Sequence, residues 1–144
     1  MTEIATAQIV STAPPSVFFE IWGDMTSWPE WNSDTEWVRL EGPFVQGARG
    51  RLKPRGGPSV PFTVERLDDT AFVDVSKLLG ARLVFAHLVT AMPEGTRIDV
   101  TIGIDGPLGW LWRRIMGAGL ASSVETDLHA LVARAEGRVV AESR

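Results

Sequence analysis

The chain has 144 residues, 44% of them hydrophobic and 22% charged, so it can bury the core of one globular domain but not of two. Its formal net charge is -4 and its basic residues are scattered, which argues against nucleic acid as a partner. Cysteine is absent, and this excludes disulfides, thiolate metal sites and cysteine nucleophiles.

The N-terminal residues lack the basic and apolar regions of a signal peptide, and no apolar run approaches the ~20 residues of a membrane span. We therefore expect a cytoplasmic protein without a membrane span. Apolar alternation predicts a first strand over residues 4–11, which ends before Pro14 and Pro15 because proline cannot donate to a strand ladder. Apolar residues at helical spacing then predict a short helix from Pro15 to Gly23.

A second short helical turn is predicted over residues 25–28, before Trp28-Pro29-Glu30-Trp31 interrupts it. From residue 35 onwards the pattern predicts strands separated by short turns rich in glycine, proline or aspartate. These predicted strands cover residues 35–41, 50–53, 60–67, 71–78, 82–91 and 96–104. Connections this short favour an antiparallel meander, because parallel neighbours need a crossover of about a dozen residues or more.

The longest predicted element is a helix from Pro107 to about Glu136, which is expected to stop at Gly137. At ~1.5 Å per residue it is long enough to cross a whole sheet. Its predicted apolar face, which must pack against that sheet, contains Leu108, Trp112, Ile115, Gly119 or Leu120, Val124, Leu128, Leu131 and Ala135.

Four stretches of the chain resemble, in their order and spacing, the START/Bet v 1-like (SRPBCC) superfamily, in particular its polyketide cyclase/dehydrase and lipid-transport-like branch. They are Ala13-Pro14-Pro15-Ser16-Val17-Phe18, Trp28-Pro29-Glu30-Trp31-Asn32, Pro93-Glu94-Gly95-Thr96-Arg97 and Gly106-Pro107-Leu108. The resemblance implies an α+β helix-grip fold, in which a seven-stranded curved antiparallel sheet wraps around a long C-terminal helix and two short helices follow the first strand. It also implies one ligand-binding domain over residues 1–144, with a cavity between sheet and helix.

Small residues occupy the middle of the predicted long helix, namely Gly117, Ala118, Gly119, Ala121, Ser122 and Ser123. An interior glycine costs about 1 kcal/mol relative to alanine, so a compensating role is expected. Either the small side chains leave a void that a ligand fills, or they permit close contact with the sheet or a kink. We favour the void, because the family resemblance supports it.

Strand alternation places a largely apolar set of residues on the face that is predicted to point towards the helix, which favours an apolar ligand. By resemblance, Trp31 is a lid or a stacking surface for this ligand; the alternative is an aromatic plug that completes the core. The predicted ligand-binding residues are Trp31, Phe62, Val64, Leu83, Phe85, His87, Val89, Ile98, Val100, Ile102, Ile115, Gly119 and Ser123.

His87 is the one ionisable residue on this predicted inner face. It is a candidate for orienting a ligand carbonyl or hydroxyl, or for acid–base chemistry near neutral pH. The alternative, which we favour because the sequence places no carboxylate to orient the ring, is a neutral core histidine bonded to the backbone or to water. His129 follows Glu125 by four residues and fits an ordinary helical pair. Two histidines without cysteine make a poor zinc site, so neither a metal nor a cofactor is predicted.

Two further groups of residues are candidates for contacts at the surface. Arg49, Arg51 and Lys53 alternate along a predicted strand, so they either ring the cavity opening or form a solvated face of the sheet. Trp110 and Trp112 lie on different faces of the helix start. One is therefore expected to pack and the other to stay exposed, where it would support a homodimer.

No catalytic triad order, phosphate loop, carboxylate pair or dinucleotide motif appears in the sequence. We therefore expect a protein that binds a small hydrophobic ligand, such as a lipid or a polyketide-like or aromatic metabolite. One alternative is a polyketide cyclase, aromatase or dehydratase that uses His87 as acid or base. Another is a protein-interaction module whose cavity has collapsed.

Overall fold

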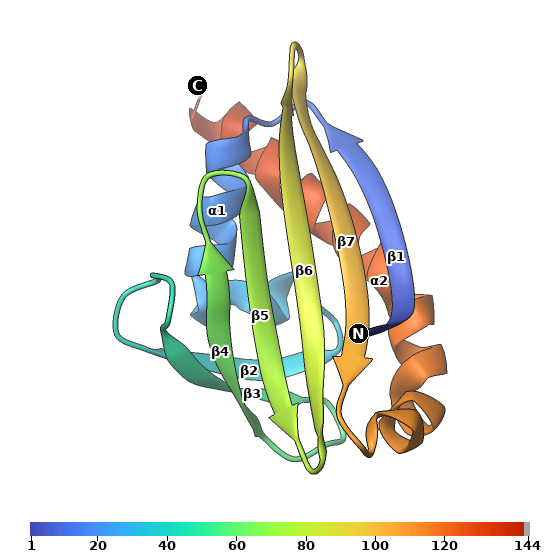
Figure 1. Cartoon of the computed structure of the whole chain (residues 1–144). Coiled ribbons are helices and arrows are strands. Elements are labelled where there is room, and N and C mark those ends of the chain that lie inside the picture. The colour runs from blue at the N-terminus through green and yellow to red at the C-terminus, as the bar shows by residue number, and fades with distance from the viewer. Residues whose placement is uncertain (143–144) are drawn as a thin grey trace.

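The computed structural model describes residues 1–142 and consists of one sheet and three helical segments on the same side of it (Figure 1). The elements in chain order are β1 (Thr2–Ser11), α1 (Pro15–Gly23), the 3-10 helix η1 (Met25–Glu30), β2 (Thr35–Glu41), β3 (Arg49–Pro54), β4 (Val60–Leu67), β5 (Ala71–Leu78), β6 (Ala81–Met92), β7 (Gly95–Asp105) and α2 (Gly109–Glu142). The predicted strands and short helices are confirmed, with ends that differ by a few residues at most.

The sheet has seven antiparallel strands in the order β1-β7-β6-β5-β4-β3-β2. Every neighbour except the β1–β7 pair is also a neighbour in sequence, which is the predicted meander closed by the first strand. Figure 1 shows α2 crossing behind this curved sheet, where it packs closest against β1. The predicted helix-grip fold class is therefore confirmed.

The start of α1 follows from two prolines. Pro14 has an extended backbone and Pro15 occupies the first turn, where the missing N–H would have had no partner in any case. The helix then buries Val17, Phe18, Ile21 and Trp22 against the core. Trp22 is 1% exposed, so α1 closes one end of the layer between sheet and α2.

The register between β5 and β6 decides which β5 residues face the helix. Phe72 pairs with His87, Asp74 with Phe85 and Ser76 with Leu83. Directly paired residues share a face of the sheet, so these β5 residues lie on the inner face beside the buried Leu83.

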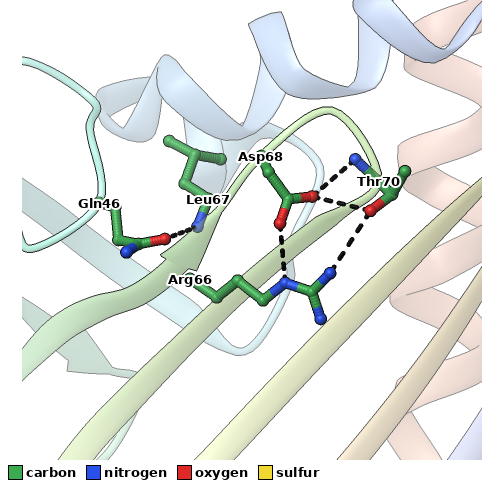
Figure 2. A network of polar contacts seen from close by, with 5 residues as sticks. All are labelled: Gln46, Arg66, Leu67, Asp68 and Thr70. Atoms are coloured by element: carbon green, nitrogen blue, oxygen red, sulfur yellow. Dashed lines mark hydrogen bonds and ion pairs between the residues drawn. The ribbon is translucent and has the colours of Figure 1, made fainter.

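The turn between β4 and β5 is held by a local polar network (Figure 2). The Asp68 carboxylate accepts hydrogen bonds from Arg66 Nε at 2.8 Å and from the backbone N–H and hydroxyl of Thr70, both at 2.8 Å. These bonds hold the pKa of Asp68 well below its usual range. Gln46 from the β2–β3 connection accepts a hydrogen bond from the Leu67 backbone at 3.1 Å and ties that loop to the same turn.

The predicted helix end at Gly137 is wrong, because α2 continues to Glu142. Gly137 is exposed and an added Cβ there would meet nothing within 4 Å. Val139 beyond it packs against the core, so burial of the following turn outweighs the ~1 kcal/mol cost of an interior glycine.

The predicted inward face of α2 is partly wrong as well. Ile115 is 66% exposed and Gly119 faces open space, whereas Met116 and Leu120 pack against the core. Each residue advances a helix by about 100°, so the inward position after Trp112 falls on Met116 and not on Ile115, and of the predicted pair Gly119 or Leu120 it is Leu120 that packs inward. The same face then runs through Val124 and Leu128, where prediction and structure agree.

Candidate functional site

A cavity of about 220 Å³ lies between the inner face of the sheet and α2. Its walls come from α1, η1 and the loop after it, strands β2 to β7, and α2. Most of its lining is apolar, and the residues are Trp22, Trp28, Trp31, Asn32, Asp34, Thr35, Leu52, Pro54, Val60, Asp74, Ser76, Leu78, Leu83, Phe85, His87, Val100, Ile102, Met116, Leu120, Ser123, Val124, Asp127, Leu128 and Leu131. The predicted alternative with a collapsed interior therefore does not apply.

The structure separates the predicted ligand-binding residues into three groups. One group lines the cavity: Trp31, Leu83, Phe85, His87, Val100, Ile102 and Ser123. A second group is buried in the core around it without reaching the cavity: Phe62, Val64, Val89 and Ile98. Ile115 and Gly119 lie on the solvent side of α2, so their predicted inward placement is corrected. That the first group binds a ligand stays a prediction.

The origin of the cavity differs from the one predicted. Gly117 is buried, and a Cβ there would lie 3.9 Å from Ile4 Cγ2, so this position gives close contact between α2 and β1. Among the other small residues of the helix middle, only Ser123 lines the cavity. Its helix wall instead consists mainly of larger residues such as Met116, Leu120 and Leu128. Because α2 packs closest on β1, the open space lies over the strands further along the curved sheet.

His87 lies on β6 with its ring between two aromatic side chains. It stacks on Phe72, with ring centroids 5.0 Å apart and an interplanar angle of 12°, and its centroid lies 5.0 Å from that of Trp22. Nδ1 donates to the Phe72 carbonyl oxygen at 2.9 Å, which leaves Nε2 as the unprotonated nitrogen. Burial lowers the pKa of His87 to about 4, so the ring is neutral at neutral pH.

Asp74 on β5 is an inner-face carboxyl that the sequence reading missed. It is 6% exposed, lines the cavity and takes part in no hydrogen bond with another described side chain. Burial raises its pKa to about 7. Apolar residues also alternate at Ala71, Val73 and Val75, so the sequence pattern does not select which face of β5 points inward. The pairing of β5 with β6, which brings Asp74 opposite Phe85, is the signal that would have found it.

Asp127 on α2 is a second carboxyl that the sequence reading missed. Burial and the neighbouring Asp34 carboxyl raise the pKa of Asp127 to about 7, against a hydrogen bond from the Ser33 backbone that lowers it. Its Oδ1 atom is buried and has no hydrogen-bond partner. Asp34 is exposed and also lines the cavity, so the cavity reaches the surface here.

The tryptophans of the loop after α1 have different surroundings. Trp28 is 7% exposed and donates from Nε1 to the Trp22 carbonyl at 3.1 Å, so it belongs to the core. Trp31 lies beside it, with ring centroids 5.9 Å apart, and its buried Nε1 has no hydrogen-bond partner. Trp37 does not line the cavity and is covered by the Arg39 guanidinium, 4.4 Å from its ring centroid.

The basic row of β3 lies on the solvated face of the sheet. Gly50, Leu52 and Pro54 alternate with it and face the interior. Arg51 donates to Ser59 at 3.2 Å, and Lys53 pairs with Glu36. The cavity lining therefore contains no lysine or arginine among the described residues.

The two tryptophans at the start of α2 have different surroundings. Trp112 donates from Nε1 to the Leu79 carbonyl at 2.8 Å, while Trp110 is 64% exposed, so one packs and the other does not; a homodimer stays a prediction.

Within residues 1–142, no three acidic or histidine side chains are grouped as metal ligands. None of the helices in this range has the length and apolar character needed to cross a membrane.

A curved antiparallel sheet around one long helix, with a mostly apolar cavity between them, defines the helix-grip class of small domains. The chain belongs to the family described as Polyketide cyclase / dehydrase and lipid transport, whose profile matches residues 2–136. It is thereby a member of the SRPBCC superfamily, as the motifs predicted. No protein of curated function matches the sequence.

Solved structures repeat the fold at low sequence identity. The Zhui aromatase/cyclase from a Streptomyces species is 17% identical with a TM-score of 0.74, and the match covers 94% of both chains. A hypothetical protein from Helicobacter pylori is 16% identical with a TM-score of 0.71, covering 91% of this chain and 86% of that one. Ara h 8.0201 is 15% identical with a TM-score of 0.64, covering 92% and 96%. At these identities the similarity shows the fold alone.

Proposed function

We propose that the protein binds a small, mostly apolar molecule in the cavity between the sheet and α2. The observation that carries this proposal is the cavity itself, about 220 Å³ enclosed by apolar side chains such as Leu83, Phe85 and Leu128. Cavities of this kind are the usual sites for small ligands, because contact with apolar walls releases water from both surfaces.

The volume limits the size of the ligand. An apolar cavity of about 150 Å³ takes up benzene, so about 220 Å³ suits a molecule of one or two rings or a short acyl chain. A long polyketide chain or a complete phospholipid would need the cavity to widen or would extend past Asp34 into solvent. We therefore place compact aromatic and short aliphatic compounds first.

The test uses a two-ring dye whose fluorescence changes in apolar surroundings, such as 1-aminonaphthalene, and a matched pair of variants. Ser123→Phe puts a ring into the cavity from α2, while Ser122→Phe puts the same ring on the exposed side of the same helix. We expect saturable binding to the wild type and to Ser122→Phe, and a loss of at least about tenfold in Ser123→Phe. Equal binding to both variants, or none to the wild type, would contradict the proposal.

A second candidate function is catalysis of a cyclase, aromatase or dehydratase type. It is favoured by one observation, the presence of His87 and Asp74 on the inner face of neighbouring strands. His87 Nε2 can accept a proton from a carbon between two carbonyls, and Asp74 with a pKa of about 7 can donate one to a carbonyl oxygen. A pKa of about 4 makes His87 a weak base, however, which is why binding ranks first.

The catalytic candidate is tested with a short β-polyketone thioester as substrate. Wild-type protein, His87→Ala and Asp74→Asn are incubated with it, and cyclised or dehydrated products are measured by mass spectrometry against a buffer control. Product formation above the buffer rate that both substitutions remove would favour catalysis. A rate equal to buffer, combined with saturable dye binding, leaves binding as the function.

A further inference from the structure

Two buried polar atoms at one end of the cavity have no hydrogen-bond partner. They are Nε1 of Trp31, which can only donate, and Oδ1 of Asp127, which accepts when the carboxyl is ionised. Both residues line the cavity. Native proteins pair nearly all buried polar atoms, so an unpaired donor and an unpaired acceptor in one cavity indicate that a guest satisfies them.

The two atoms belong to the same end of the cavity. Asp127 accepts a hydrogen bond from the backbone of Ser33 and interacts with the carboxyl of Asp34, and both residues follow Trp31 closely in the chain. Asn32 and Asp34 from the same loop and Thr35 at the start of β2 line the cavity as well. We call this end the Trp31 end.

The charges around the cavity restrict the polar group of a guest further. Asp34, Asp74 and Asp127 contribute carboxyls to the lining, and no described lysine or arginine contributes to it. His87 is neutral and its Nδ1 proton is already bound to the Phe72 carbonyl. A carboxylate or phosphate in this cavity would therefore meet carboxyls and no cation, which is unfavourable in surroundings of low dielectric constant.

We propose that the natural ligand is an apolar molecule with a hydroxyl group, alcoholic or phenolic, which binds at the Trp31 end by accepting from Trp31 Nε1 and donating to the Asp127 carboxyl. This rests on the proposed ligand-binding function and adds the chemical class of the ligand. A hydroxyl is the smallest group that both accepts and donates. A ketone or an ether only accepts, an ammonium only donates, and a carboxylate only accepts and is repelled.

The first test measures wild-type protein against a matched set of compounds at pH 7.5. Naphthalene, 2-methoxynaphthalene, 2-naphthol and 2-naphthoate each compete with the dye 1-aminonaphthalene, which is neutral at this pH. We expect 2-naphthol to bind about threefold to tenfold more tightly than 2-methoxynaphthalene, the gain of the one added hydrogen bond to Asp127, and 2-naphthoate to bind weakest. Equal affinity for the hydroxyl and methoxy compounds, or tightest binding of the carboxylate, would overturn the inference while leaving ligand binding intact.

The second test locates the hydroxyl. Trp31→Phe keeps an aromatic ring and removes the N–H, and Asp127→Ala removes the carboxyl; Trp110→Phe and Asp69→Ala are exposed control substitutions outside this cavity. We expect Asp127→Ala to lose most of the preference for 2-naphthol over 2-methoxynaphthalene, because only the hydroxyl can donate to the carboxyl. We expect Trp31→Phe to lose most of the preference for both of these compounds over naphthalene, because both can accept from Nε1. Naphthalene affinity should change less than about twofold in either variant. A preference for 2-naphthol over 2-methoxynaphthalene that persists in Asp127→Ala would overturn the inference.

The two tests also distinguish a structural role of Trp31 from recognition of the hydroxyl group. They further distinguish failure of the ligand-binding proposal from failure of the hydroxyl proposal alone. If Trp31 only packed against the ligand, Trp31→Phe would weaken the binding of all neutral compounds alike. Thermal unfolding of each variant identifies a folding defect. Asp127→Ala and the wild-type series decide the question if Trp31→Phe is unstable. Absence of dye binding to the wild type would overturn the proposed function, and the hydroxyl inference with it.

Discussion

His87 and Phe72 are joined twice across neighbouring strands, by a hydrogen bond from Nδ1 to the Phe72 carbonyl oxygen at 2.9 Å and by stacked rings with centroids 5.0 Å apart. The hydrogen bond selects one tautomer, because a carbonyl oxygen can only accept. The stacked ring and Trp22 cover part of the half-buried imidazole, and its burial favours the neutral form. This relationship makes the stability of the fold depend on pH.

His87 should make the fold sensitive to acid. Its folded-state pKa of about 4 lies below the ordinary 6.5, so between these values the unfolded chain binds a proton that the folded chain does not. Its stability contribution is therefore present above pH 6.5 and is lost as pH falls towards 4. In His87→Phe we expect a stability deficit at pH 7 that shrinks by at most about 3 kcal/mol by pH 4.5, measured by urea unfolding. A deficit that is constant with pH would contradict this.

Asp74 should act in the opposite direction. Its folded-state pKa of about 7 lies above the ordinary 3.8, so between these values the folded chain holds a proton that the unfolded chain has lost. Stability then falls as pH rises from about 4 to 7, because ionisation of the carboxyl favours the unfolded chain while burial keeps it protonated in the folded one. Relative to wild type, Asp74→Asn should gain at most about 4 kcal/mol between pH 4.5 and pH 8. Urea unfolding at both pH values measures this gain. An equal effect of the substitution on stability at both pH values would contradict the raised pKa of the buried Asp74 carboxyl.

Gly119 offers a substitution that should stabilise the protein without touching the cavity. It lies inside α2 on the solvent side, and an added Cβ would meet nothing within 4 Å. Gly119→Ala should raise the free energy of unfolding by about 1 kcal/mol through the higher helix propensity of alanine. Thermal unfolding measures the gain, and Gly137→Ala is a matched exposed control. Loss of dye binding in Gly119→Ala would mean that this position does face the cavity.

Gly95 should tolerate no side chain. Its φ is +150°, and an added Cβ would lie 1.9 Å from the Ser11 carbonyl oxygen, which belongs to the paired backbone of β1. Gly95→Ala should therefore cost more than about 2 kcal/mol, because the β1–β7 ladder must shift. Gly42→Ala is the comparison: its φ is +82° but its surroundings are open, so only backbone strain of about 1 kcal/mol is expected. Similar losses in both variants, from denaturant unfolding, would contradict the close approach.

The predictable parts of this protein are those that local pattern controls. Turn residues and alternation located the strands, and Pro15 located the first helix, because these preferences act over a few residues. The inner face of β6, including Phe85 and His87, was also predictable, since its opposite face carries the charged Arg82. Family motifs then supplied the arrangement of the elements.

Other features depended on tertiary contacts. Both faces of β5 carry apolar residues, so only its pairing with β6 showed that Asp74 points inward. Asp127 joins Asp34 across more than ninety positions of the chain, a proximity that no local pattern encodes.

The sequence by itself determined the elements, their order and the apolar character of the sheet interior, because short-range sterics and alternation are written in neighbouring residues. Only the tertiary structure decided how α2 is rotated, since a shift of about 100° exchanges Ile115 for Met116 at little local cost. It also decided where the cavity lies, because α2 packs closest against β1 and leaves space over the strands further along the curved sheet. Burial depends on all elements at once. It therefore decided between arrangements, such as the two rotations of α2, that are nearly equal in free energy for the isolated segment.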